Sequence, residues 1–119
     1  MNSQLLATEA VVRNHLQAFL EQKGLAAILS DYDKDACFHS EATSYRGKEE
    51  IGRFFANFIA SLPAGAIERF SLRSLRVDGA LAYITWSAGR EIPLGTDTFL
   101  VQKGKIVSQT FAMYMATQP

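Results

Sequence analysis

A β-hairpin signal over residues 95–111 constrains the fold of this 119-residue chain more than any other stretch. Two runs rich in β-branched and aromatic residues flank a Lys-Gly-Lys turn, which is the pattern of paired antiparallel strands. Because side chains alternate along a strand, Asp97 and Phe99 share one face of the first run. A three-residue loop with Gly104 at positive φ pairs Phe99 with Gln109 and gives one coherent apolar face, whereas a two-residue loop would mix the faces.

The apolar face of this hairpin carries one carboxylate, Asp97. A carboxylate that faces an apolar interior is costly unless it is paired, protonated or used in function. One interpretation is a pocket carboxyl group whose pKa is raised by neighbours such as Trp86 and Phe99 and which acts as an acid, a base or a hydrogen-bond donor. The alternatives are a strand-end aspartate that pairs with Arg90, or a carboxylate satisfied structurally by the amide of Gln109.

Apolar residues recur at helical spacing in the first half of the chain. The spacing predicts helices over residues 3–23, 25–30 and 48–62. In the first of these, Val12, Leu16 and Phe19 form the apolar stripe. His15 falls on a neighbouring, less apolar stripe, and it is a candidate proton-transfer group if it enters the interior.

The second half of the chain changes to a period of two. Residues 36–40 predict a short strand between the helices, and residues 41–46 predict a polar loop. From residue 66 onward the pattern predicts antiparallel strands joined by hairpins, with a bulge near residues 73–74. Helices followed by strands indicate a single α+β domain over residues 1–119, with three N-terminal helices on one face of a curved, mostly antiparallel sheet.

The opposite face of such a sheet is left open, and its composition predicts a partner. The residues expected on it are Leu81, Tyr83, Leu100, Ile106 and Tyr114. An exposed surface of this kind predicts a homodimer interface. The 12 basic and 12 acidic residues balance, so nothing favours nucleic acid or an anionic membrane as a partner.

Cysteine and histidine usage suggests a cytoplasmic chain without a metal. Cys37 is the single cysteine, so no internal disulfide is expected, which fits a reducing cytosol. No window approaches the roughly 18 uninterrupted apolar residues of a membrane span, and no signal peptide is evident. Two histidines without metal-ligand spacing, and no glycine-rich phosphate loop, predict neither a metal nor another cofactor.

Three local patterns follow one another at family-like spacing. They are Tyr32-x-x-Asp35-Ala36, then Tyr45-Arg-Gly47-Lys-Glu-Glu-Ile51-x-x-Phe54-Phe55, and finally Gly95-Thr-Asp97 with Gly104-Lys-Ile106. In these patterns the chain resembles the nuclear transport factor 2-like superfamily, particularly its SnoaL-like and ketosteroid-isomerase-like members, over almost its whole length. The resemblance implies a strongly curved sheet that forms a cone with the helices on its concave face and a pocket between the two layers.

In the isomerases of this fold, a carboxylic-acid base works with an oxyanion hole made of a tyrosine and a protonated aspartate. By resemblance, Asp97 falls at the protonated aspartate, while Ser40 stands where the base would be. The tyrosine position falls at His15 or Leu16, so steroid isomerisation is not expected. Dehydratases of this fold use a histidine–aspartate pair, which makes His39 a candidate although strand alternation turns it away from the cavity.

Two functional hypotheses follow. The catalytic candidates are Asp97, His15 and His39, and the predicted pocket residues are Tyr32, Phe38, Ser40, Phe54, Phe58, Trp86, Phe99, Gln109, Phe111 and Met113. In the first hypothesis a small-molecule ligand binds in the cavity, and the chain is a cofactor-free isomerase, dehydratase or cyclase acting on a small apolar or ring-containing substrate by acid/base chemistry. The alternative is a non-catalytic ligand-binding or dimerisation module, which a cavity filled by its own side chains would favour.

Overall fold

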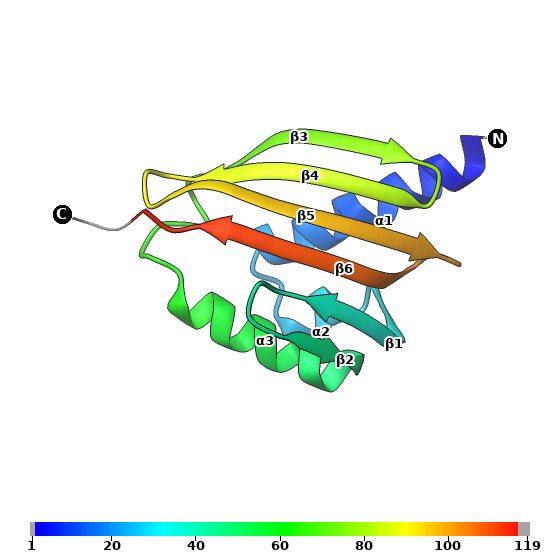
Figure 1. The fold of residues 1–119 in the computed structure, drawn as a ribbon, viewed down its shortest axis with the longest axis horizontal. Helices are drawn as coiled ribbons and strands as arrows, with labels where there is room; N and C mark the ends of the chain where they lie inside the picture. The colour runs from blue at the N-terminus through cyan, green and yellow to red at the C-terminus, as the bar shows by residue number, and fades with distance from the viewer. Residues whose placement is uncertain (1, 117–119) are drawn as a thin grey trace.

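The computed structural model describes residues 2–116, which form three helices and six strands. These are α1 (Asn2–Leu20), α2 (Leu25–Leu29), β1 (Tyr32–His39), β2 (Ser44–Arg46), α3 (Gly47–Ser61), β3 (Phe70–Asp78), β4 (Leu81–Ala88), β5 (Ile92–Gln102) and β6 (Lys105–Tyr114). Within this range the strands form one sheet in the order β2-β1-β6-β5-β4-β3. Figure 1 shows α1 crossing the sheet behind β3, β4 and β5, with α3 running beside β1 and β2. The predicted α+β architecture is confirmed.

Several strand boundaries differ from the predictions. The strand pattern expected from residue 66 onward begins with β3 at Phe70, because residues 64–69 form a turn. The strand predicted over residues 36–40 begins at Tyr32 instead, and part of the loop predicted over residues 41–46 is β2. The strand pairings of β1 explain both of these differences. β1 runs parallel to β6, where Tyr32 is opposite Ile106, and it runs antiparallel to β2. The polar side chains of residues 33–35 are largely exposed. Because they interrupt the alternation of apolar and polar residues, the sequence pattern does not show that the strand begins at Tyr32.

The register of the final hairpin is confirmed, but its loop is shorter than predicted. Phe99 lies opposite Gln109 as expected. The connection is the two-residue turn Lys103-Gly104, with φ of 53° and 76° at its two residues. Positive φ at both positions is the geometry of a type I′ turn, whose twist matches that of the flanking strands. Glycine at the second position supplies this conformation without steric cost.

A β-bulge restores the register that the shorter loop would have lost. Leu100 lies opposite Ser108, whereas Val101 lies opposite Ile106, so Val107 is the extra residue. The bulge reverses the side-chain alternation at the start of β6. Ile106 is therefore fully buried, and its predicted place on the open sheet face is wrong. The bulge predicted in β3 is confirmed by a register shift between residues 72 and 74.

The face of α1 that packs on the sheet is not its most apolar stripe. Thr8, Val12, His15 and Ala18 are all buried and follow one another along the inward side. The Thr8 hydroxyl donates a 2.7 Å hydrogen bond to the backbone carbonyl of Gly79 in the β3–β4 turn, which fixes the rotation of the helix. This rotation places His15 against the sheet instead of on a marginal stripe.

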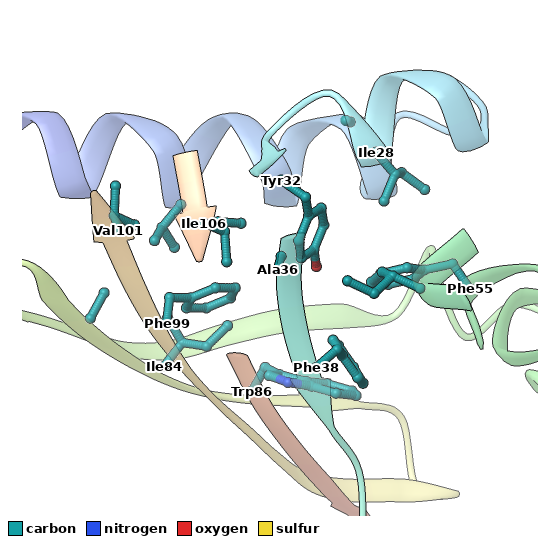
Figure 2. Packing of buried hydrophobic residues seen from close by; sticks show 14 of the residues in the cluster. Ile28, Tyr32, Ala36, Phe38, Phe55, Ile84, Trp86, Phe99, Val101 and Ile106 are labelled. Atoms are coloured by element: carbon teal, nitrogen blue, oxygen red, sulfur yellow. The ribbon is translucent and has the colours of Figure 1, made fainter. Parts of the chain in front are cut away.

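The core fills the space between the helices and the concave face. Figure 2 shows its side chains converging from both layers, with Ile28 and Phe55 from the helices and Phe38, Trp86 and Phe99 from the strands. Burial of these large side chains supplies most of the driving force for folding. Across residues 2–116, the helices are too short or too polar to cross a membrane.

Candidate functional site

An apolar pocket lies between the helices and the sheet, with a volume of about 60 Å³. Its lining consists mostly of aromatic and aliphatic side chains: His15, Leu16, Phe19, Phe38, Phe54, Phe55, Phe58, Leu62, Ala66, Ile67, Phe70, Trp86, Ala88, Ile92, Asp97, Phe99, Gln109 and Phe111. Eight of these side chains are only half-buried: Leu16, Phe19, Phe54, Phe58, Leu62, Ile67, Phe70 and Phe111. Seven of the eight come from α1, α3 and residues 62–70, so the mouth of the pocket lies on that side.

Asp97 sits in the wall of this pocket and is held by two N–H donors. The indole Nε1 of Trp86 donates to its Oδ1, and Nε2 of Gln109 donates to its Oδ2, both at 2.8 Å. The hydroxyl of Tyr32 in turn donates to Oε1 of Gln109. The predicted pairing of Asp97 with Gln109 is present, whereas Arg90 is exposed on the surface. Each donor favours the ionised form of the carboxyl group.

Burial and hydrogen bonding act on the pKa of Asp97 in opposite directions. Burial raises the pKa from its ordinary value of 3.8 to about 6, while the bonds from Trp86 and Gln109 limit the rise. The pKa of Tyr32 is raised well above its usual range by burial and by the charges of Asp97 and Asp31. Tyr32 therefore remains a protonated donor, and the chain of hydrogen bonds runs toward Asp97. With a pKa of about 6 the carboxyl group is mostly ionised at neutral pH, in the form that accepts both hydrogen bonds.

Gly95 explains why the indole can reach this carboxylate. Gly95 lies opposite Trp86 in the β4–β5 register, and a Cβ atom at position 95 would overlap the indole ring. Trp86 also stacks on Phe70, with ring centroids 5.4 Å apart and an interplanar angle of 27°. The absence of a side chain at Gly95 thus lets the indole lie flat across β5 and aim its N–H at Asp97.

His15 is the second titratable group in the pocket wall. Its ring is 4% exposed and meets the rings of Tyr32, Phe55 and Phe99 at edge angles, with centroids 5.4 to 5.8 Å apart. Burial lowers the pKa of the imidazole to about 4, offset in part by a hydrogen bond with the backbone of Ile28. Within residues 2–116, Nδ1 has no hydrogen-bond partner. Leaving such an atom unpaired costs about 1–3 kcal/mol.

Four of the predicted site residues lie elsewhere. His39 is exposed on β1, where its Nδ1 is 2.7 Å from the Ser44 hydroxyl. Ser40 accepts backbone N–H groups of the following turn, so it serves as a turn cap. Tyr32 stands one hydrogen bond behind the pocket wall, and Met113 packs against the core without lining the pocket. The structure thus brings His15 and Asp97 together and leaves His39 outside.

Nine lining residues were not predicted as pocket residues: Leu16, Phe19, Phe55, Leu62, Ala66, Ile67, Phe70, Ala88 and Ile92. Phe19 and Phe55 lie on predicted helical stripes and read as ordinary core. Phe70 and Ile92 stand at the starts of strands, and Ala66 lies in a connection without periodicity. Apolar residues carry no signal that separates a pocket wall from a packed core, so only the tertiary arrangement identifies them.

Several solved structures share this fold at low sequence identity. An NTF2-like protein of unknown function from Burkholderia xenovorans is 19% identical with a TM-score of 0.75, over 95% of this chain and 87% of that one. A protein from Kribbella flavida provisionally named a ketosteroid isomerase is 16% identical with a TM-score of 0.71, over 100% and 86% of the two chains. A provisionally named polyketide cyclase from Sinorhizobium meliloti is 17% identical with a TM-score of 0.71, over 86% and 93%. At these identities the likeness establishes the fold alone.

The sequence itself establishes the family. No curated protein matches the chain. Residues 12–109, however, match the family model described as the SnoaL-like domain. This span includes β1, α3, β3, β4, β5 and both pocket residues with shifted pKa values, His15 and Asp97. The chain belongs to the SnoaL-like domain family, within the NTF2-like fold.

Proposed function

We propose that this protein is a small-molecule enzyme of the isomerase, dehydratase or cyclase type, in which Asp97 acts as a general base on an apolar substrate. The observation that carries the proposal is the environment of Asp97. Its carboxylate is 8% exposed, lies in the wall of an apolar pocket and is oriented by two N–H donors. With a pKa of about 6, it is ionised near neutral pH and strong enough to accept a proton from a substrate.

The proposed step is a proton transfer within the pocket. Asp97 removes a proton from a substrate carbon next to an electron-withdrawing group, and the bonding electrons shift toward that group. The protonated Asp97 then returns the proton at another carbon, which isomerises the substrate. In a dehydration the enolate instead expels a hydroxyl group, which leaves as water with the proton from Asp97. In a cyclisation the enolate carbon forms a bond to a second carbonyl carbon, whose oxygen takes that proton. The balance needs no external oxidant or reductant. Apolar walls strengthen the electrostatic interactions of the carboxylate with its substrate by excluding water.

The pocket volume limits the substrate. About 60 Å³ is less than half of the roughly 150 Å³ of an engineered apolar cavity that binds benzene. A ring therefore enters fully only if half-buried side chains at the mouth, such as Phe19 and Phe58, move aside. We expect a small substrate, or a larger one that inserts only its reacting end.

Proton exchange at carbon tests the proposal without knowledge of the natural substrate. Wild type is incubated in D₂O with a panel of small ketones and hydroxyketones, and deuterium incorporation is followed by NMR. We expect catalysed exchange that rises with pH through about 6, because the base must be ionised. Asp97→Asn should lose it, while Asp35→Asn, an exposed acid on β1, should retain it. Equal exchange in wild type and Asp97→Asn would exclude Asp97 as the base.

The second candidate is a non-catalytic ligand-binding or dimerisation module, as favoured by the complete hydrogen bonding of Asp97 to Trp86 and Gln109. Its signature is thermal stabilisation by a ligand without exchange at carbon. A ligand at ten times its Kd stabilises the folded state by about 1.4 kcal/mol, which gives a measurable rise in Tm. For either candidate we propose a homodimer through the outer sheet face and a cytoplasmic location, the latter because Cys37 is the single cysteine.

A further inference from the structure

A second hollow lies on the surface beside the pocket, between α1 and the edge strand β3. It is an open groove with a volume of about 300 Å³, which we name the α1–β3 groove. Its helical side is one face of α1, formed by residues three and four positions apart: Arg13, Leu16, Gln17, Leu20 and Glu21. Its other side is one face of β3, formed by Phe70 and Leu72.

The α1–β3 groove and the pocket that contains Asp97 share two wall residues. Leu16 and Phe70 line both hollows, and both side chains are half-buried. Phe70 also stacks on Trp86, whose indole donates a hydrogen bond to Asp97. A ligand that passes between Leu16 and Phe70 would therefore reach from the groove to the pocket wall that holds the carboxylate.

The surface of the α1–β3 groove suits a neutral hydrocarbon chain. Its leucine and phenylalanine side chains are half-buried and supply an apolar surface. Its polar side chains are exposed and bonded to neighbours on the same helix. Nε of Arg13 donates to Glu9 at 2.7 Å, and Nε2 of Gln17 donates to Glu21 at 2.9 Å. Because these groups already have partners, the groove favours an uncharged ligand segment over a charged one.

We propose that the α1–β3 groove binds the unbranched hydrocarbon chain of a substrate whose carbonyl end lies in the pocket beside Asp97. This inference rests on the proposed function, because it requires a reacting group at Asp97. The pocket, at about 60 Å³, holds little more than the reacting group, whereas the groove adds about 300 Å³. A methylene chain is thinner than a ring, so it needs the smaller displacement of Leu16 and Phe70. The substrate class is thus an aliphatic ketone or a related carbonyl compound with a linear tail.

A series of unbranched methyl ketones tests this inference. Binding of butan-2-one, pentan-2-one, hexan-2-one and octan-2-one is measured by NMR titration. Once the pocket is full, each further methylene group gains apolar contact only in the groove. The affinity of wild type should therefore rise about 2- to 4-fold for each added methylene group. The upper value corresponds to a methylene group that is fully buried, and the lower value to one that is half-buried.

A pair of leucine substitutions locates the chain. Leu20→Ser changes the groove and leaves the pocket intact, because Leu20 lines the groove but not the pocket. We expect it to weaken binding of octan-2-one by about 3- to 12-fold, the effect of burying half a leucine side chain, and to leave binding of butan-2-one unchanged. Leu25→Ser is the matched control, at a 37% exposed leucine of α2 that lines neither hollow, and it should behave as wild type.

The outcomes separate the inference from the proposed function. If none of the ketones binds to wild type, the proposed ligand pocket fails and the inference falls with it. If butan-2-one and octan-2-one bind equally tightly to wild type, the pocket stands and the role of the groove is refuted. An affinity that rises with chain length equally in wild type and Leu20→Ser would place the chain elsewhere on the protein and also refute it.

An NMR measurement on wild type keeps the inference testable even if Leu20→Ser does not fold. In protein with ¹³C-labelled leucine methyl groups, the terminal methyl group of octan-2-one should show nuclear Overhauser effects to Leu20 and Leu72. Effects to Leu81, which is exposed on the outer face of the sheet, in place of these two would overturn the inference.

Discussion

Replacement of Asp97 by asparagine should stabilise the folded protein at neutral pH. The folded state holds a carboxyl group whose pKa is raised from 3.8 to about 6, so it binds the proton more tightly than the unfolded chain does. The contribution of this carboxyl group to the free energy of unfolding is fully present below the pKa of the unfolded chain. It is lost as the pH rises from about 4 to 6. From these two values, the charge costs about 3 kcal/mol at pH 7.5 and about 0.5 kcal/mol at pH 4.

The hydrogen-bond network can accept the asparagine. Asp97 accepts an N–H group at each of its two oxygens. In Asp97→Asn, the new NH₂ group would therefore face the N–H group of Trp86 or Gln109. Rotation of the Gln109 amide by half a turn turns its oxygen toward the new NH₂ group. The Tyr32 hydroxyl can then accept from Gln109 instead of donating to it. The substitution therefore removes the charge at the cost of a rearrangement, with no buried polar group left unpaired.

Urea unfolding of wild type and Asp97→Asn at pH 7.5 and pH 4 measures the effect. The stability of the variant relative to wild type should fall by about 2.5 kcal/mol between pH 7.5 and pH 4, the difference of the two charge costs. Asp35→Asn, at an exposed position, should change by less than about 0.5 kcal/mol. A variant that is less stable than wild type by the same amount at both pH values would refute the reasoning, because burial would then not raise the pKa.

Three further substitutions test the surroundings of the site. Gln109→Leu should destabilise the fold by about 2–3 kcal/mol in urea, because the tyrosine hydroxyl of β1 and one carboxylate oxygen of β5 lose their partners; an unchanged midpoint would contradict this. Gly95→Ala should displace Trp86, seen as a shift in tryptophan fluorescence and a loss of stability, whereas an unshifted spectrum would show that the indole has room. Leu81→Lys combined with Tyr83→Lys should convert the proposed homodimer to a monomer in sedimentation, since both side chains are exposed on the outer face, 44% and 39% respectively; a monomeric wild type would contradict the interface.

The local patterns of the chain were sufficient for much of the fold. The spacing of apolar residues predicted α3 within one residue at each end. The alternation in β5 correctly turned Asp97 inward, where Gln109 donates a hydrogen bond to it. The register of the β5–β6 hairpin was also predicted correctly, although for the wrong reason. A two-residue turn and a bulge at Val107 give the same pairing as a three-residue loop beyond the bulge, and they bury Ile106. Sequence alternation cannot distinguish these solutions, because they differ only near the turn.

The sequence by itself determined that a carboxylate would lie on the apolar face of a curved sheet, because alternation and period depend only on neighbouring residues. The tertiary structure decided what that carboxylate meets. Trp86 reaches Asp97 because β4 and β5 place it over Gly95, and the parallel β1–β6 pair carries Tyr32 to Gln109. The rotation of α1, set by its contacts with the sheet, turns His15 into the same pocket. These contacts join residues far apart in the chain, so burial and hydrogen bonding there depend on packing that no local pattern encodes.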